Sequence, residues 1–542
     1  MKRIIILSVL LLAALAGQAQ DRIYVVTDRP AYLAGDLVYC SLFCTDEKGR
    51  ISDFSAVSYL ELISTDGTAA EVKIGLLEGR GAGVFRIPAQ VPTGNYALLA
   101  YTARSQAVAE GTRRIAVFNS TSTARVKDGV SLVPESEYQV SVAAEQPALG
   151  GLSLSIPGRL RSGQDATLLI GGLDKDASLA VSVWHEDGLA PQDGKTLSGF
   201  LHGKAAAPGP RMGEYEGEII YASVEGMKRS DDQATAILST AGSPSNVYIG
   251  RSTEDGRINF VTDNIYGDRE LVCEVTSVQG QECHINLASP FRHPAPEEPL
   301  PPLVLSAAQR GALVSRKAAL QASAPLDTLD LFLPKRQNLL LETAPAITYH
   351  LDDYTRFPTV REICVEFIQE LQFVKKDGTW RIRMIKADGV EARKYSQDNI
   401  LVMMDGVVLS DHGMLEDFDA MLLEDIDIYP EGIAISGVAY NGVVNFVSKK
   451  NYVTALHFPS NVRVVDFKGV SYPVWYKGNA PKTEERDMRQ LLYWHPAQEL
   501  KADETLRIPL HTPAYSGRFK VVAEGWTSDG EPLRAEYSFD VE

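Results

Sequence analysis

Apolar and polar residues alternate along most of this chain, and that pattern constrains the fold more than any other feature. It is clearest in "AVSYLELIS", "ASLAVSVWH" and "RFKVVAEGW", and turn signals such as "DEKGR", "STDGT" and "TSDGE" separate such runs. Successive side chains of a strand point to opposite faces, so each run places its apolar residues on one side of a sheet. The sequence predicts a mainly β protein built from several immunoglobulin-like antiparallel sandwiches, with room for about three to five domains.

One segment has a helical period instead. In "TVREICVEFIQEL" the apolar residues would share one face of an amphipathic helix; they are Val360, Ile363, Cys364, Phe367, Ile368 and Leu371. This helix predicts a small α+β domain among the sandwiches.

The first nineteen residues have the pattern of a secretory signal peptide. Lys2 and Arg3 precede the apolar run 4–16, and Gly17-Gln18-Ala19 offers small residues for cleavage. The run is shorter than the roughly 20 residues of a membrane-spanning helix, and no second long apolar run follows. We expect an exported chain without a transmembrane segment after cleavage. Its formal net charge of -17, more negative still without Lys2 and Arg3, argues against nucleic acid as a partner.

The cysteines do not form a disulfide framework. Cys40 and Cys44 would lie roughly 13 Å apart along one strand, too far for a disulfide. Cys273 and Cys283 flank a turn at Gln279-Gly280, so they could pair across a hairpin or remain buried small side chains, which is the favoured alternative.

Residues 20–118 carry two turn-rich motifs. The first is "DRPAYLAGD" and the second is "GVFRIPAQVPTGNY". Their proline and glycine positions fix turns, and the sandwich core is predicted to contain Tyr32, Val38, Phe85, Ile87 and Tyr96. Together the motifs resemble the macroglobulin-type domain of the alpha-2-macroglobulin family.

That resemblance implies a mechanical or adhesive sandwich. The family's larger members carry a protease-trapping thioester in a C-G-E-Q stretch, which this sequence lacks. Gln281-Glu282-Cys283 has similar letters in reversed order and receives no such role.

Further domains are predicted along the chain. Residues 121–210 form a second sandwich, and 214–290 resemble the small regulatory sandwich found beside carboxypeptidases and outer-membrane receptors, with a turn at Asp255-Gly256. Residues 291–355 form a proline-rich linker and a mixed connection. Residues 451–482 are a connection, and 483–542 form a C-terminal sandwich, in which Trp494 and Trp526 are assigned to the core rather than to a partner surface.

Residues 356–450 resemble the plug domain of TonB-dependent outer-membrane receptors. The resemblance rests on Met404-Asp405-Gly406-Val407, Glu424-Asp425-Ile426-Asp427-Ile428 and Asn441-Gly442-Val443-Val444. The residues after Lys450 are too few for a receptor barrel of 22 strands at about ten residues each. We therefore expect a plug-like module that serves as a compact interaction domain.

Acidic residues gather in "NILVMMDGVVLSDHGMLEDFDAMLLEDIDIYPEG", which raises the question of a metal or acid–base site. Asp405-Gly406 is a turn pair, and Asp425 and Asp427 alternate with two isoleucines, so we predict that these acids face solvent. A calcium loop would need other residues than Tyr429 and Pro430, and His412 has no second histidine at zinc-ligand spacing. We predict no catalytic, cofactor-binding or metal site here.

No common catalytic or nucleotide-binding motif occurs elsewhere in the sequence. We expect a non-enzymatic envelope protein, without a cofactor, in the periplasm or at the outer membrane or surface of a Gram-negative cell, binding a protein or glycan. Two alternatives remain open. One is an accessory of TonB-dependent uptake that docks to a separate outer-membrane barrel protein; the other is a macroglobulin-like protease inhibitor or colonisation factor without a thioester.

Overall fold

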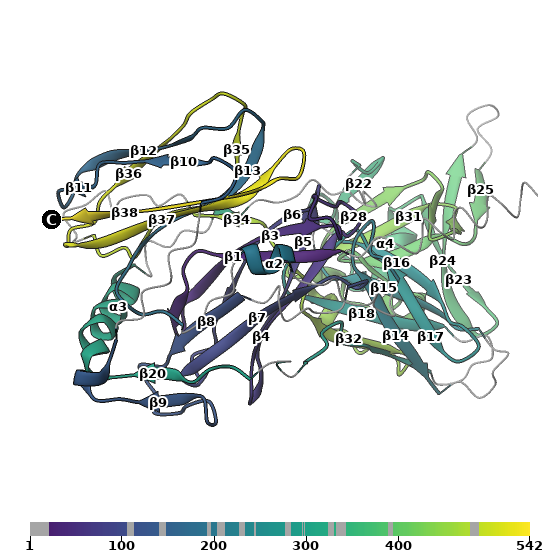
Figure 1. Ribbon diagram of the computed structural model, residues 1–542. Helices are drawn as coiled ribbons and strands as arrows, with labels where there is room; N and C mark the ends of the chain where they lie inside the picture. Colours follow the sequence, from purple (N-terminus) through teal and green to yellow (C-terminus); the bar gives the residue numbers. More distant parts are fainter. Residues whose placement is uncertain are drawn as a thin grey trace, which may run out of the picture. The chain divides into compact units, whose positions relative to one another are not determined.

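The computed structural model describes residues 21–105, 113–139, 148–191, 197–202, 212–226, 233–242, 245–276, 283–294, 296, 299–323, 330–331, 343–387, 394–476 and 487–542. The expected signal peptide lies outside these residues. The chain divides into two compact units (Figure 1). Unit 1 comprises Met1–Gly217, Phe291–Pro334 and Val470–Glu542, and unit 2 comprises Glu218–Pro290 and Lys335–Gly469. Strands dominate and mostly pair antiparallel, so the predicted mainly β class is confirmed.

Unit 1 begins with the sandwich expected at residues 20–118. The strand order is β1-β3-β6-β5-β4-β7-β8-β2. The strands are β1 (Arg22–Thr27), β2 (Ala31–Leu33), β3 (Leu37–Thr45), β4 (Val57–Ser64), β5 (Gly67–Leu77), β6 (Arg80–Arg86), β7 (Gly94–Tyr101) and β8 (Arg113–Phe118). The predicted core is confirmed, because Tyr32, Val38, Phe85, Ile87 and Tyr96 are all buried.

Two buried aspartates explain the spacing of the residues in the first motif, "DRPAYLAGD". Asp28 accepts hydrogen bonds from the Tyr32 hydroxyl at 2.7 Å and from the Tyr39 amide at 3.0 Å. Asp36 accepts one from the Leu33 amide at 2.8 Å. Burial of an unbonded carboxylate is costly, so each acid needs its partner at this position in the turn.

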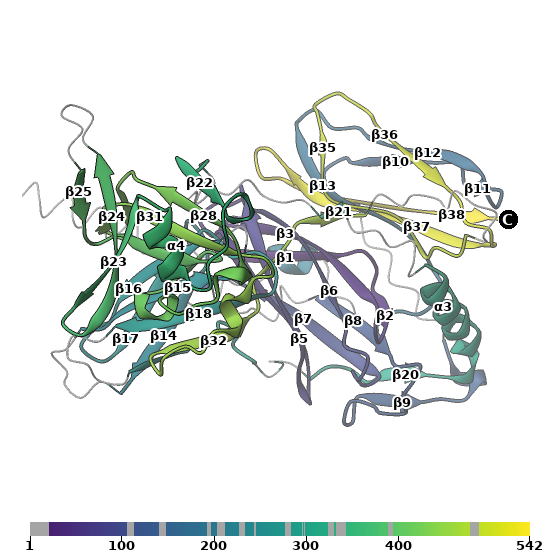
Figure 2. The ribbon, with the colours of Figure 1, turned by 180° about the vertical axis from the view of Figure 1, so that it is seen from behind.

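The second sandwich of unit 1 is assembled from both ends of the chain. It contains β10 (Ser153–Ser155), β11 (Arg159–Leu160), β12 (Asp165–Gly171), β13 (Ala177–His185), β35 (Leu491–Leu500), β36 (Leu506–His511), β37 (Gly517–Thr527) and β38 (Pro532–Val541). One sheet has the order β10-β12-β36, and the other has the order β11-β38-β37-β13-β35. Figures 1 and 2 show the yellow C-terminal strands beside the blue ones. The segments 121–210 and 483–542 thus contribute to one sandwich instead of forming one each.

The two tryptophans of the last segment are core residues, as predicted. Trp526 is fully buried, packs against Phe43 and donates its indole N–H to the Gly49 carbonyl at 3.0 Å. Trp494 is buried against Tyr39.

The remaining elements of unit 1 are connections. They are β9 (Val130–Leu132), η2 (Glu135–Glu137), α2 (Leu197–His202), β20 (Leu303–Leu305), η3 (Ala307–Gln309), α3 (Arg310–Ser323), β21 (Asp330–Leu331), β33 (Val470–Ser471) and β34 (Val474–Trp475). The predicted linker and mixed connection, 291–355, supplies β20 and α3 here and continues into unit 2. In the expected connection 451–482, β33 pairs with β5 and β34 with β21.

Unit 2 contains a small sandwich with sheets of order β17-β14-β19 and β16-β15-β18-β32. Its strands are β14 (Ile219–Glu225), β15 (Thr235–Thr240), β16 (Val247–Arg251), β17 (Arg257–Val261), β18 (Arg269–Thr276), β19 (His284–Leu287) and β32 (Val462–Phe467). Cys273 and Cys283 are buried in its core. All five cysteines lie within the described residues, and no disulfide joins any of them.

The rest of unit 2 surrounds a sheet of order β22-β28-β31-β26-β27. These strands are β22 (Ile347–His350), β28 (Leu423–Tyr429), β31 (Val443–Ser448), β26 (Leu401–Met404) and β27 (Val407–Val408). Beside them lie η4 (Leu351–Asp353), α4 (Val360–Glu366), β23 (Leu371–Lys376), β24 (Thr379–Ala387), β25 (Lys394–Gln397), η5 (His412–Leu415), η6 (Ala420–Leu422), β29 (Ile433–Ile435), β30 (Val438–Tyr440) and η7 (Tyr452–Ala455).

Helix α4 is shorter than the predicted one. Its start is fixed by a capping box between Thr359 and Glu362, but Phe367 leaves the helical conformation with φ -141°. Ile368 and Leu371 are buried as expected, although they follow the helix, and Leu371 begins β23. The spacing of apolar residues therefore stays helical beyond the end of α4. The reason is that the turn and the strand after the helix bury their apolar residues in the same core.

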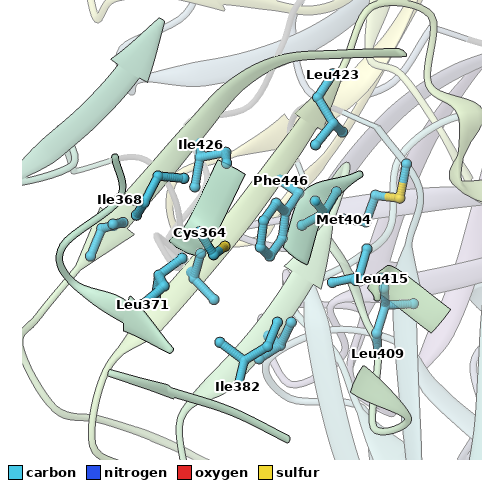
Figure 3. Close-up of a cluster of buried hydrophobic side chains, with 14 of the residues drawn as sticks. Cys364, Ile368, Leu371, Ile382, Met404, Leu409, Leu415, Leu423, Ile426 and Phe446 are labelled. Carbon is cyan, nitrogen blue, oxygen red and sulfur yellow. The ribbon is translucent and has the colours of Figure 1, made fainter. Parts of the chain in front are cut away.

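Both faces of this sheet are covered, which explains the uninterrupted apolar run "ILVMM". Val402 and Met404 join a core with α4, and Figure 3 shows the labelled side chains of this core around the ring of Phe446. Leu401 and Met403 point the other way and pack with Ile237 of β15. A strand buried on both faces has no need of alternating polar residues.

Candidate functional site

Among the acidic residues of the segment 399–432, Asp405 is the most buried. Asp405-Gly406 forms the predicted turn, with φ values of 48° and 81°. However, the Asp405 side chain is buried, and it accepts hydrogen bonds from the Ser448 amide at 2.7 Å, the Ser448 hydroxyl at 2.6 Å and the Val453 amide at 3.3 Å. The prediction that Asp405 faces solvent is wrong, because its carboxylate secures the chain just after β31.

Asp425 and Asp427 lie on one face of β28, as predicted, while Ile426 and Ile428 are fully buried. Neither acid is simply solvated, because both contact the polar face of β22. Asp427 accepts a hydrogen bond from the Thr348 hydroxyl at 2.7 Å, and partial burial raises the pKa of its carboxyl. Asp425 lies 2.8 Å from His350 Nδ1, and this hydrogen bond raises the pKa of the exposed imidazole.

His412 is the histidine of the acidic segment. Its Nδ1 accepts a hydrogen bond from the Ile382 amide at 2.9 Å, which fixes a strand edge to η5. Burial, reinforced by the nearby Arg381 charge, lowers the pKa of the imidazole to about 4. Across the parts of the chain that the structure describes, no group of His, Cys, Asp and Glu has an arrangement suited to a metal ion.

A pocket of about 320 Å³ lies in unit 2 beside the β23–β24 hairpin. It is lined by residues of β23 and β24, by segments 398–402 and 408–410, and by Ile237, His412 and Tyr440. Pockets of roughly 300–1,000 Å³ accommodate small molecules or single side chains of a partner. This pocket is our candidate site.

The charged residues of the pocket come mainly from the β23–β24 hairpin. Lys376, Arg381 and Arg383 line it together with one acid, Asp398. The Arg383 Nε lies 2.5 Å from the Asp398 carboxylate, so this pair neutralises itself. The Arg381 guanidinium donates to the Ser410 carbonyl at 2.7 Å, and Lys376 is exposed.

The opposite side of the same hairpin has its own cations. Trp380 lies beneath the Arg361 guanidinium at 4.7 Å and the Lys375 ammonium at 5.3 Å, both measured to a ring centroid. Arg361 also pairs with Glu416 at 3.4 Å. Cations therefore flank both faces of a hairpin in a chain of net negative charge.

Sequence analysis did not single out this hairpin. The available signal was the cation-rich stretch "FVKKDGTWRIRMIK" in an acidic chain. The alternation of a hairpin would have placed Lys376, Arg381 and Arg383 on one face. The pocket itself could not be predicted, because its other walls come from segments 398–402 and 408–410, from Ile237 of β15 and from Tyr440 of β30.

A glutamate lies just behind the pocket wall. Glu274 of β18 is buried, and its carboxylate accepts a hydrogen bond from the Ser410 amide at 3.4 Å. Burial raises the pKa of this carboxyl. Glu274 thus supports the segment to which Arg381 is bonded.

No protein-family model and no curated protein matches this sequence. Solved structures that it resembles include trypsin-activated alpha-2-macroglobulin from Escherichia coli, with 10% identity over 96% of this chain and 42% of that chain, at a TM-score of 0.25. Salmonella alpha-2-macroglobulin reacted with methylamine has 11% identity over 97% and 40%, at 0.23. Dimeric latent PorU from Porphyromonas gingivalis has 10% identity over 50% and 33%, at 0.16.

The chain spans about two fifths of the length of the alpha-2-macroglobulins that it matches. Within the described residues, no helix is long and apolar enough to cross a membrane.

Proposed function

We propose that this chain is a non-enzymatic, exported protein of a Gram-negative cell envelope that binds a protein or glycan partner at or near the outer membrane. The observation that carries the proposal is that the acids and the histidine of the acidic segment in unit 2 are hydrogen-bonded within the chain itself. Asp405 and His412 accept hydrogen bonds from the chain's own amides, and Asp425 and Asp427 contact β22. The pocket, in contrast, presents cations, which suit recognition of a partner rather than acid–base catalysis.

The proposal assigns recognition to the module of residues 356–450, whose motifs resemble a receptor plug. The sheet of this module is covered on both faces. The β23–β24 hairpin carries charged and aromatic side chains, such as Lys375 over Trp380. The macroglobulin-type sandwich of unit 1 serves as a scaffold in this view. Its ionisable groups Asp28 and Asp36 are likewise bonded within their own turn.

Affinity capture with the full chain tests the proposal. The purified protein is immobilised, incubated with the native envelope fraction, cross-linked and analysed by mass spectrometry, with a denatured sample of the same protein as the control. We expect one envelope partner to be enriched by the folded protein alone. Equal recovery on the denatured control, or turnover of an envelope substrate by the pure protein, would contradict the proposal.

The identity of the partner separates the alternatives. Recovery of an outer-membrane barrel protein would favour docking to an uptake receptor. Retention of active trypsin by the pure chain would instead favour the protease-inhibitor alternative, which here would have to work without a thioester.

A further inference from the structure

We propose that the pocket beside β24 binds an oxyanion, a carboxylate or a phosphate, carried on a small apolar body, through Lys376 and Arg381. This assigns a ligand chemistry to the pocket that the proposed function does not specify. The proposal can fail while the envelope partner is found, and it can hold while no such partner exists.

The pairing of the hairpin places the cations together. In the β23–β24 register, Val374 lies opposite Arg381 and Lys376 lies opposite Thr379. Directly opposed residues of paired strands share a face, and so do residues two positions apart on one strand. Lys376, two positions after Val374, therefore projects from the same face as Arg381 and is its diagonal neighbour. Like charges so placed repel each other unless an anion lies between or beside them.

Few acids are free to neutralise these two cations. Within the described residues, no carboxylate forms an ion pair with Lys376 or Arg381. Asp398 is engaged with Arg383 at 2.5 Å. Glu274 accepts from the Ser410 amide, and Asp411 accepts from the Gly413 amide at 3.0 Å. The Glu274 charge also interacts with Arg381 and offsets part of its charge.

Arg381 is also held in place for a ligand. Its Nη1 donates to the Ser410 carbonyl, which fixes the guanidinium while other N–H groups remain available. Charge-assisted hydrogen bonds from such a group to an oxyanion are stronger than neutral ones. His412 adds a donor to the same wall, because its Nδ1 accepts from Ile382 and the neutral ring then carries its proton on Nε2.

The other walls suit an apolar body. Ile237, Val374 and Val408 line the pocket beside the cations, and its volume of about 320 Å³ is that of a small ligand. A ligand with one anionic end and a short apolar end would match both parts. Inorganic ions alone would leave the apolar wall uncovered.

Saturation-transfer NMR on the full chain tests this inference with three probes: hexanoate, hexyl phosphate and neutral hexanamide. We expect saturable binding of at least one anion, weakened by added salt, and no saturable binding of hexanamide. Hexanoate and hexyl phosphate distinguish the carboxylate source from the phosphate source. Equal binding of hexanamide, or no saturable binding of either anion, would overturn the proposal.

Charge variants locate the site. Lys376→Gln and Arg381→Gln should each weaken anion binding about tenfold, the factor that corresponds to loss of one charged contact. Lys375→Gln is the matched control, because it removes the same charge from the adjacent residue, whose side chain lies over Trp380 on the opposite face. Circular dichroism verifies folding, and the exposed Lys376 keeps the test valid if Arg381→Gln unfolds. Equal weakening by Lys375→Gln would show that only the general charge of the hairpin matters.

Discussion

At the residue scale, Asp405 shows how a turn signal can hide a structural role. The pair Asp405-Gly406 gives the turn, and the sequence predicted that turn correctly. What it did not predict is the carboxylate's bonding to Ser448 and Val453, residues more than forty positions further along the chain. Local pattern gives backbone conformation, whereas burial depends on which distant segments fold over the turn.

We therefore expect Asp405→Asn to destabilise unit 2. Asparagine keeps one acceptor oxygen, so its NH2 group would face the N–H donor of either Ser448 or Val453, and an unsatisfied buried group costs about 1–3 kcal/mol. Hydrogen exchange of β31 measures the loss. Asp425→Asn is the control, because Asp425 contacts the exposed His350 and should change exchange little. Unchanged protection of β31 in Asp405→Asn would contradict this account.

His412 should make unit 2 sensitive to acid. Its folded pKa is about 4, below the usual value of 6.5 in the unfolded chain, so the unfolded state binds more protons between these values. Stability should fall as the pH drops from about 6.5 to 4. In His412→Gln, whose side-chain carbonyl can still accept from Ile382, the decline should be shallower. The measurement is exchange of the β24 amides against pH, and parallel profiles for the two proteins would exclude this role.

At the scale of elements, alternation identified the strands but did not always predict which face is buried. Strand β4 is buried along its whole length, and β13 is buried at every position except His185. The faces of β28 came out as expected, with Ile426 and Ile428 buried. Prediction was poorer where two elements share one core, as at the end of α4. There the period of apolar residues continues although the backbone has changed to a strand.

Two Asp-Gly turns of unit 2 allow a matched comparison. Gly378 and Gly406 have φ values of 83° and 81°, but a Cβ on Gly378 would meet nothing within 4 Å, whereas one on Gly406 would lie 2.2 Å from the Ser245 Cβ. Gly378→Ala should cost about 1 kcal/mol from backbone strain alone. Gly406→Ala should cost clearly more, because Ser245 must move. Urea unfolding of both variants checks this, and equal losses would mean that the β26–β27 turn is not packed against Ser245.

At the scale of the whole molecule, the sequence predicted the class but not the assembly. Strands β12 and β13 find their partners in β35–β37, more than three hundred residues away in the chain. Alternation identifies a strand, but nothing in a single sequence states which strand lies beside it. The candidate pocket was missed for the same reason, since its walls come from segments far apart.

The shared sandwich predicts that the C-terminal segment is needed for the fold of β13. Removal of residues 487–542 takes away both neighbours of β13, namely β35 and β37, together with half of the buried core between the sheets. We expect the amides of Ala177–His185 to lose protection in hydrogen exchange, while β4 and β7 stay protected. Continued protection of β13 in the shortened chain would contradict the strand pairing.

The central claim, that the module of residues 356–450 recognises an envelope partner, is tested most directly by site-specific photo-cross-linking in the native envelope. A photoreactive side chain is placed at exposed positions of the module, namely Val365, Lys376 and Met421, and at exposed positions of unit 1, namely Leu77, Leu132 and Val314. We predict cross-links to one partner from positions of the module and none from unit 1. Cross-links to that partner from unit 1 alone would show that the sandwiches carry recognition and would contradict the claim.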